Sequence, residues 1–374
     1  MARSSPKNRY RMPAEWEPHA ATWLAWPHYK LDWPGKFEPI PWVFAEIIRY
    51  LSRHERVELI VKDAAAEQSA RKTLRLAHAL NENVRFHRWP TDRIWTRDSG
   101  CAFVFEGEAA GAATPVPPRR VGGRATDVSA HAAQLAAVKW SFNAWAKYPN
   151  WKRDEKIGSL MAEAAGADEI QAVFVKKRVV LEGGSIDVNG RGTLITTEEC
   201  LLSRVQQRNP GMKKRDYEKI FAEYLGATNV IWLGSGIVGD DTHGHVDDIT
   251  RFVSPDTVVT CVDSDPASEN YEALRDNVRR LRDATVEDGK PLATIDLPMP
   301  APVYFEGRRL PASYANFYIG NHAVIVPTFN DPHDRRALQI LAELFPTRRV
   351  VGIHAVDLVW GLGTLHCMTQ QEPA

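Results

Sequence analysis

Short runs of β-branched and apolar residues alternate along the chain with longer segments of helical spacing. Val57–Val61 is such an apolar run, Ala64–Leu80 has helical spacing, and Val84–Trp89 alternates as a strand does. The same order predicts further strands at Asn229–Leu233, Val258–Val262, Ala293–Leu297, Ala323–Pro327 and Arg349–Ile353, and further helices at Tyr217–Leu225, Ser268–Asp283 and Asp334–Leu344. A strand–helix–strand unit thus returns about five times without a clear sequence repeat, which predicts an α/β fold.

No Gly/Ser-rich or Pro-rich linker divides the chain. Residues 106–124 are rich in Gly, Ala, Pro and Arg and are predicted to be a surface insertion. Residues 1–11 are basic and polar and are expected to be flexible. We therefore predict a single domain over residues 1–374.

The composition argues against several classes of protein. Hydrophobic residues make up 44% of the 374 residues, and 47 Lys and Arg balance 47 Asp and Glu, so bulk charge attracts neither nucleic acid nor a membrane. No apolar segment of the kind found in secretory signals follows the basic residues 1–10. No apolar run approaches the ~20 residues that are needed to cross a bilayer. Four cysteines without a CxxC pair fit a reducing, cytoplasmic setting.

One of these cysteines, Cys367, lies close to the end of the chain. The apolar run Ala355–Trp360 precedes it and is followed by two glycines, which predicts a buried strand that leads into a tight turn. A thiol held on such a turn could be a nucleophile. The alternative is a small buried cysteine that acts as a hydrophobic residue, which is the interpretation for Cys101, Cys200 and Cys261 in their apolar runs.

Two carboxylates stand beside glycines in apolar surroundings. Asp98 lies next to Arg97 in a segment that ends at Gly100, and Glu182 lies within the apolar run Val179–Val188. If that run is a strand, the Glu182 carboxylate is buried and needs a cation or several donors. The alternatives are an exposed Arg97–Asp98 loop and a hairpin with Glu182 at a sheet edge.

A third segment, residues 239–248, gathers four acids and two histidines after a strand. His243, His245, Asp241 and Asp247 have the residue types of a metal site. Alternatively, one histidine is a general acid and base while a carboxylate binds a cationic substrate. A solvated acidic turn fits poorly, because apolar residues follow the histidines.

Together these residues suggest a guanidinium substrate. Carboxylates pair with this planar cation in bidentate fashion, but its central carbon is a poor electrophile, so attack requires a nearby thiolate and a proton for the leaving amine.

The sequence resembles the agmatine deiminases, which are related to the bacterial peptidylarginine deiminases within the guanidino-group-modifying superfamily. The resemblance rests on an ordered set of motifs: Met12–His19, Trp23–Pro27, Trp95–Gly100, Phe142–Trp145, Leu181–Ile186, Gly244–Asp247, Tyr314–Ile319 and His366–Gln371. It implies a five-bladed α/β propeller (pentein) with pseudo-fivefold symmetry and a site in the central channel.

The resemblance also implies a role for each matching residue. Cys367 matches the nucleophile, His245 the general acid and base, and Asp98 and Asp247 the carboxylates that hold the guanidinium. Glu182 matches an acid beside the nucleophile, Trp95 an aromatic residue at the substrate, and Asp241 an acid near the far amine of agmatine. The chain departs from the family pattern at Leu362, Thr364, Cys101 and His243. These departures are expected to affect the part of the pocket that contacts the substrate's tail.

The reaction implied is hydrolytic deimination through a covalent thiouronium on Cys367, most simply agmatine and water to N-carbamoylputrescine and ammonia. It needs a small guanidino substrate and no metal or organic cofactor, and members of the family are often homo-oligomers. The alternatives are the same chemistry on arginine or peptidyl-arginine, a metal-dependent hydrolase, and a non-catalytic guanidine-binding protein. The tryptophans at 140, 145 and 151 are predicted to be core residues of one helical stretch.

Overall fold

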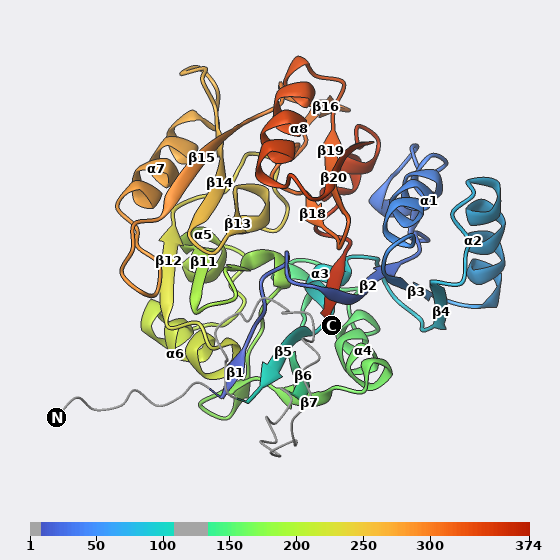
Figure 1. The fold of residues 1–374 in the computed structure, drawn as a ribbon, viewed down its shortest axis with the longest axis horizontal. Helices are drawn as coiled ribbons and strands as arrows, with labels where there is room; N and C mark the ends of the chain where they lie inside the picture. The colour runs from blue at the N-terminus through green and yellow to red at the C-terminus, as the bar shows by residue number, and fades with distance from the viewer. Residues whose placement is uncertain (1–8, 108–133) are drawn as a thin grey trace, which may run out of the picture.

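One arrangement of strands and a helix recurs along the chain (Figure 1). The structure, a computed structural model, describes residues 9–107 and 134–374. In each repeat a strand pairs antiparallel with a central strand, and a helix then connects two strands that run parallel. Within the described residues these repeats form five sheets of three or four strands. The predicted α/β fold is confirmed.

The sheets, each in spatial order, are β1 (Tyr10–Arg11), β5 (Ala102–Glu106), β6 (Gln134–Lys139) and β7 (Asp168–Gln171); β10 (Asp187–Val188), β11 (Thr193–Thr197) and β12 (Asn229–Leu233); β13 (Thr250–Ser254), β14 (Thr257–Val262) and β15 (Ala293–Pro298); β18 (Tyr318–Ile319), β19 (Ala323–Thr328) and β20 (Arg349–His354); and β21 (Gln370–Pro373), β2 (His19–Ala25), β3 (Arg56–Val61) and β4 (Val84–Arg88). Two hairpins join β8 (Val173–Phe174) to β9 (Lys177–Arg178) and β16 (Tyr304–Phe305) to β17 (Arg308–Arg309).

The α-helices are α1 (Ile40–Leu51), α2 (Ala64–Leu76), α3 (Thr96–Ser99), α4 (Ile157–Ala165), α5 (Glu198–Leu202), α6 (Lys214–Leu225), α7 (Tyr271–Arg282) and α8 (Pro332–Leu344). Local sequence fixes several of their ends. Asp331 caps α8 through His333 N, and Pro332 occupies the first turn, where its missing N–H costs nothing. The helix predicted over 64–80 ends at Leu76, because His78 adopts a left-handed φ of 53° that cannot continue it.

Two predicted irregular segments need correction. The prediction that residues 1–11 are flexible is wrong for Tyr10 and Arg11, because these two residues form β1 and pair with β5. The insertion predicted over 106–124 cannot include Glu106, which is the last residue of β5 and pairs with Gln134. The remainder, 108–124, lies outside the described residues.

The end of the chain also differs from the prediction. Ala355–Trp360 is no strand, because a 3₁₀ helix, η6 (Leu358–Gly361), occupies its second half, where the Leu358 carbonyl accepts from Trp33 Nε1. The strand follows Cys367 instead: β21 is buried and pairs antiparallel with β2 near the start of the chain (Figure 1).

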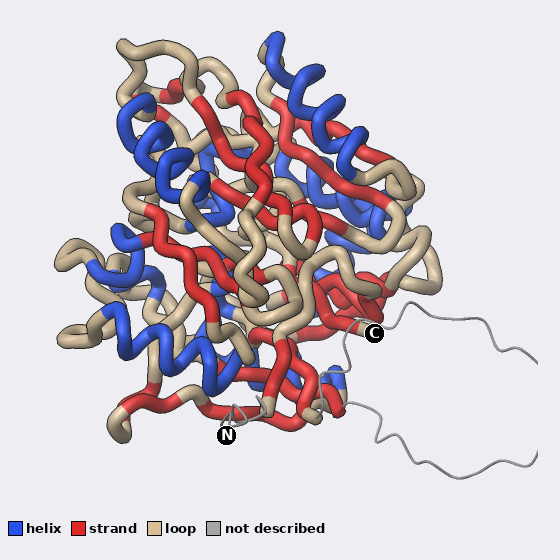
Figure 2. The backbone as a smooth tube through the Cα atoms, turned by 60° about the vertical axis from the view of Figure 1, so that its left-hand side comes forward, coloured by secondary structure: helices blue, strands red, loops and turns tan. Residues whose placement is uncertain are grey.

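The helices lie mainly toward the outside of the molecule, and the strands lie between them and a centre that loops cross (Figure 2). The amphipathic helices bury one apolar face, as Ile47, Ile48 and Leu51 do in α1. Among helices in 9–107 and 134–374, none combines the length and apolar character needed to cross a bilayer.

Candidate active site

Four segments that are distant in sequence meet at the centre of the molecule. Helix α3 packs against η4 (Gly183–Ser185), which packs against η5 (Val246–Asp248). The loop before β21 joins them, since Arg97 N donates to the Cys367 carbonyl over 3.3 Å. This contact brings the segments of Asp98, Glu182, His245 and Cys367 together.

The Cys367 thiol lies at the inner end of a pocket. Its Sγ accepts a hydrogen bond from Asn316 Nδ2 at 3.1 Å and lies 3.8 Å from Asp247 Oδ2. Burial and the nearby carboxylates of Asp247, Asp248 and Asp98 raise the pKa of this thiol well above its ordinary value. Before a cation arrives, Cys367 is therefore protonated at neutral pH.

Asp98 and Asp247 both face the imidazole of His245. Its Nδ1 lies 3.9 Å from Asp98 Oδ1 and 4.0 Å from Asp247 Oδ1. Burial opposes a charge on His245, but Asp98, Cys200 and Glu182 raise its pKa well above the ordinary value. The imidazole is thus a proton donor at neutral pH.

Each of the two aspartates is held by other groups. Asp98 accepts from Gly184 N at 3.1 Å and from Trp145 Nε1 at 2.9 Å, and Asp247 Oδ2 binds His366 Nδ1 at 2.7 Å. Burial acts to raise the pKa of Asp247, but the hydrogen bond to His366 lowers it. For Asp98 the effect of burial prevails and raises the pKa to about 6.

Two glycines, Gly184 and Gly363, allow the side chains of the site to approach one another closely. A Cβ at Gly184 would lie 2.5 Å from His245 Nδ1 and 3.1 Å from Asp98 Oδ1. A Cβ at Gly363 would lie 2.8 Å from the Trp95 ring and 3.1 Å from Cys367 Cβ. Any side chain at either position would displace the catalytic candidates.

Glu182 contacts the imidazole of His245 and the guanidinium of Arg208. Its Oε2 is 3.7 Å from His245 Nε2, and its Oε1 binds Arg208 Nε at 3.1 Å. Although burial acts against ionisation, Arg208 lowers the pKa of Glu182 to about 2. The predicted burial of this carboxylate against a cation is confirmed, because Glu182 is fully buried and binds Arg208. The predicted strand and the alternative of a hairpin edge are both wrong, because Glu182 precedes the η4 turn.

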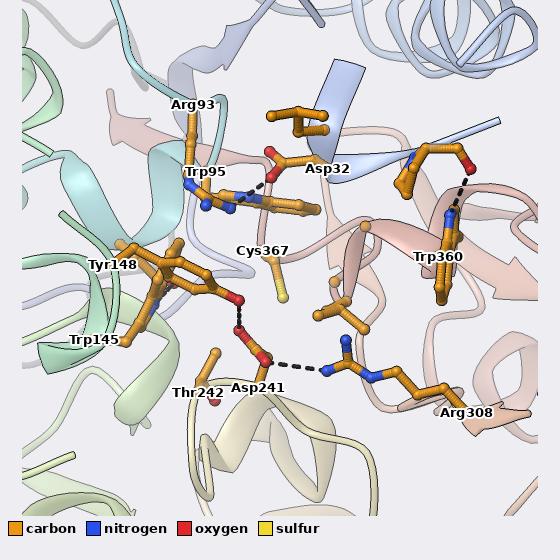
Figure 3. A pocket seen from close by; sticks show the side chains of 16 residues that line it. Asp32, Arg93, Trp95, Trp145, Tyr148, Asp241, Thr242, Arg308, Trp360 and Cys367 are labelled. Atoms are coloured by element: carbon orange, nitrogen blue, oxygen red, sulfur yellow. Dashed lines mark hydrogen bonds and ion pairs between the residues drawn. The ribbon is translucent and has the colours of Figure 1, made fainter. Parts of the chain in front are cut away.

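The pocket that leads to Cys367 has a volume of about 230 Å³, and Trp95, Trp145 and Trp360 line it (Figure 3). Trp95, the aromatic residue expected at the substrate, thus lines the same pocket as Cys367. Leu362 also lines the pocket, in a left-handed conformation with a φ of 69°.

Asp241 lies across the pocket from Asp32 (Figure 3). Its Oδ1 accepts from Lys147 Nζ at 2.6 Å and from Arg308 Nη2 at 3.1 Å, and its Oδ2 accepts from Tyr148 OH at 2.5 Å. Both oxygens of Asp241 are therefore engaged by groups of the protein.

The metal site formed by His243, His245, Asp241 and Asp247 is not assembled. The His243 side chain binds Ser203 Oγ through Nε2 at 3.0 Å, and Asp241 is taken by Lys147, Tyr148 and Arg308. Among the described residues, the groups of three buried side chains spaced like metal ligands are Glu182, Cys200 and His245, and Asp247, Asp248 and Cys367.

Several contacts were missed from the sequence. Trp145 is not in a helical stretch, since η2 (Ala144–Ala146) is a single turn whose residues all have positive φ, and its indole binds Asp98. Asn316 and His366 lie within the motifs shared with the agmatine deiminases, and those positions could have identified them. Nothing in the sequence indicated a role for Arg208, because its partner Glu182 is 26 residues away.

The comparisons with known proteins cover almost the entire chain. A family model described as Porphyromonas-type peptidyl-arginine deiminase matches residues 11–373. The chain is 32% identical to an agmatine deiminase of Ectopseudomonas mendocina, over 98% of this chain and 96% of that protein, and 33% identical to one of Pseudomonas aeruginosa, over 99% and 98%.

Solved structures agree with this result. The agmatine deiminase of Enterococcus faecalis superposes with a TM-score of 0.83 at 30% identity, covering 98% of this chain and 96% of that one. An agmatine deiminase of Campylobacter jejuni gives 0.78 at 27% identity with the same coverage. The chain is therefore a member of the Porphyromonas-type peptidyl-arginine deiminase family and a full-length relative of the agmatine deiminases.

Proposed function

We propose that this protein is a hydrolytic deiminase that converts agmatine and water to N-carbamoylputrescine and ammonia. The observation that carries the proposal is that the Cys367 thiol and the Asp98 carboxylate line one pocket and lie beside the buried His245 imidazole and Asp247 carboxylate. The relatives that are named agmatine deiminases support the choice of agmatine.

In this proposal, Asp98 and Asp247 clamp the guanidinium. Asp247 Oδ1 is buried without a hydrogen-bond partner from the described part of the chain, so it has an acceptor to offer. Holding the planar cation fixes its central carbon near the Cys367 sulfur. The positive charge also offsets the carboxylates that raise the pKa of the thiol, so substrate binding favours the thiolate.

The thiol loses its proton to solvent water, the thiolate attacks the central carbon, and a C–S bond forms. His245 gives its proton to the departing nitrogen, which leaves as ammonia, and a thiouronium remains on Cys367. The neutral imidazole next takes a proton from water, the hydroxide adds to the carbon, and the C–S bond breaks. The proton of the added hydroxyl passes to the sulfur, which restores the thiol, and the ureido product leaves.

We further infer that the chain is one domain and that the five sheets are the blades of an α/β propeller. The repeated strand order of the sheets and the central meeting of α3, η4 and η5 support this inference. A central channel would explain why residues from four distant segments form one site.

A second candidate is the same chemistry on arginine or a C-terminal arginine of a peptide. Asp241, the residue expected at the far amine of agmatine, already binds Lys147 and Arg308. Two cations at this end of the pocket favour a substrate tail that carries a carboxylate. A binding protein without activity is less consistent with the site, since binding alone has no use for a thiol at the clamp.

The test is ammonia and ureido release from agmatine, arginine and peptides that end in arginine. Agmatine should give the highest kcat/KM, and Cys367→Ala should lower it at least about 1,000-fold with an unchanged near-UV circular dichroism spectrum. Cys261→Ala, at a buried thiol in β14, is the matched control. Turnover of Cys367→Ala near the wild-type level would refute the mechanism, and a clear preference for arginine peptides would select the second candidate.

A further inference from the structure

A second buried cysteine lies behind the His245 imidazole. One ligand atom from each of Glu182, Cys200 and His245 lies within 4.8 Å of the others. Cys200 is held there by its short helix α5, whose capping residue Thr197 accepts from Cys200 N and donates to the carbonyl of Gly244, the neighbour of His245. The chemistry proposed above does not use the Cys200 thiol.

Three of the side-chain polar atoms in this cluster are unsatisfied. Glu182 Oε2 and both ring nitrogens of His245 are buried and have no hydrogen-bond partner among residues 9–107 and 134–374. Such atoms are rare in folded proteins, because burial without a partner is costly. One carboxylate oxygen of Glu182 and one ring nitrogen of His245 lie within 4.8 Å of the Cys200 sulfur, which indicates that this region suits a ligand.

The donor set matches zinc. A thiolate, an imidazole and a carboxylate are the side chains that bind Zn²⁺, and neutral imidazole leaves two negative charges to balance the ion. The distance from His245 Nε2 to Glu182 Oε2 is 3.7 Å, close to the ~3.3 Å that bonds of about 2.0 Å impose across a tetrahedral angle.

Arg208 does not block such an ion. It engages the other oxygen of Glu182 and donates its remaining hydrogen bonds to the carbonyls of Gln206 and Thr242. Glu182 Oε2 therefore remains available. Asp98 lies on the opposite edge of the imidazole and adds negative charge nearby.

We propose that Glu182, Cys200 and His245 form an inhibitory binding site for Zn²⁺ or another thiophilic divalent cation. The inhibition, though not the binding, rests on the proposed deiminase function. An ion on Nε2 leaves the imidazole proton on Nδ1, which faces Asp98 and Asp247. The imidazole then has no nitrogen free to take a second proton, so it cannot serve as acid and base.

Binding is tested without reference to activity. Co²⁺ is titrated into Cys367→Ala, which removes the thiol of the other candidate ligand group, with a phosphine as the only reductant. A near-ultraviolet thiolate-to-Co²⁺ absorption band at one ion per chain is expected, since soft thiolates bind this metal directly. The band should be lost in Cys367→Ala/Cys200→Ala and kept in Cys367→Ala/Cys101→Ala, the matched control at another buried thiol.

A missing band in Cys367→Ala, or a band that survives removal of Cys200, overturns the proposal. Cys200→Ser serves if the alanine variant does not fold, since its hydroxyl keeps the polar contact but is a poor zinc ligand. Inhibition of agmatine turnover by Zn²⁺ should weaken at least about tenfold in Cys200→Ala and remain unchanged in Cys101→Ala. Equal inhibition of both variants would place the inhibitory ion elsewhere, and the inhibitory role would be withdrawn.

Discussion

Asn316 Nδ2 donates a hydrogen bond to Cys367 Sγ over 3.1 Å. The same amide nitrogen binds Asp248 Oδ1 at 2.9 Å, and the Asn316 side-chain oxygen accepts from Thr364 Oγ1 and His366 N. One buried side chain thus orients the thiol and fixes the loop that carries it. Burial and the surrounding carboxylates raise the pKa of the thiol, and the backbone of Thr364 lowers it. A hydrogen bond donated by the Asn316 amide also favours the thiolate.

Replacing Asn316 by alanine should therefore make Cys367 less reactive. A hydrogen bond to a charged acceptor contributes about 1.5–3 kcal/mol, so its loss should raise the pKa of the thiol further. The pH profile of the rate of alkylation by iodoacetamide should move to higher pH, and kcat should fall.

Thr364→Val is the graded control for this prediction, because it removes only the hydrogen bond to Asn316 Oδ1 and keeps the shape of the side chain. It should shift the alkylation profile by less than Asn316→Ala. An unchanged profile in Asn316→Ala would show that the amide has only a structural role.

The binding of guanidines should weaken in mild acid. Burial raises the pKa of Asp98 to about 6, and a protonated carboxyl cannot pair with a guanidinium. The affinity of Cys367→Ala for agmatine, measured by calorimetry, should fall as the pH decreases through about 6 and level off above it. An affinity that stays constant from pH 8 to pH 5 would mean that Asp98 does not hold the cation.

Removing the charge of Arg208 should destabilise the fold in a pH-dependent way. Arg208→Gln leaves the buried Glu182 carboxylate without its cation, and breaking such a pair costs about 3–5 kcal/mol. Against the effect of burial, Arg208 and His245 together lower the pKa of Glu182 in the folded state to about 2 from 4.5. The stabilisation is therefore complete above pH 4.5 and is lost as the pH falls toward 2.

Urea unfolding should therefore show a difference between wild type and Arg208→Gln that is largest at neutral pH and shrinks below pH 4.5. Arg208→Lys keeps a charge and should lose less stability. A difference that stays the same between pH 7 and pH 3 would contradict the assignment of this pair.

Leu362 should limit the size of the substrate. It lines the pocket with a left-handed backbone that glycine adopts without cost, so Leu362→Gly widens the pocket and changes the free energy of unfolding by no more than about 1 kcal/mol. The ratio of kcat/KM for a C-terminal arginine peptide to that for agmatine should rise. Leu362→Ala widens the pocket but keeps the strain, and an unchanged ratio in both variants would exclude a role in selection.

The sequence by itself determined the fold class and the residue types of the chemistry. The strand Asn229–Leu233 has the predicted bounds, because its β-branched run lies between clear breaks. Asp98, Glu182, His245 and Cys367 were found because a thiol, a histidine and carboxylates in ordered motifs carry their identity in the sequence itself. Their roles in catalysis remain predictions.

Only the tertiary structure decided the partners of these residues. The contacts of Asn316 with Cys367 and of Trp145 with Asp98 join positions 51 and 47 residues apart, far beyond the reach of helix or strand periodicity. Asp241, expected to be free for a substrate amine, is paired with Lys147 and Arg308. Charge, pKa and available hydrogen bonds depend on distance and burial, and the packing of distant segments sets both.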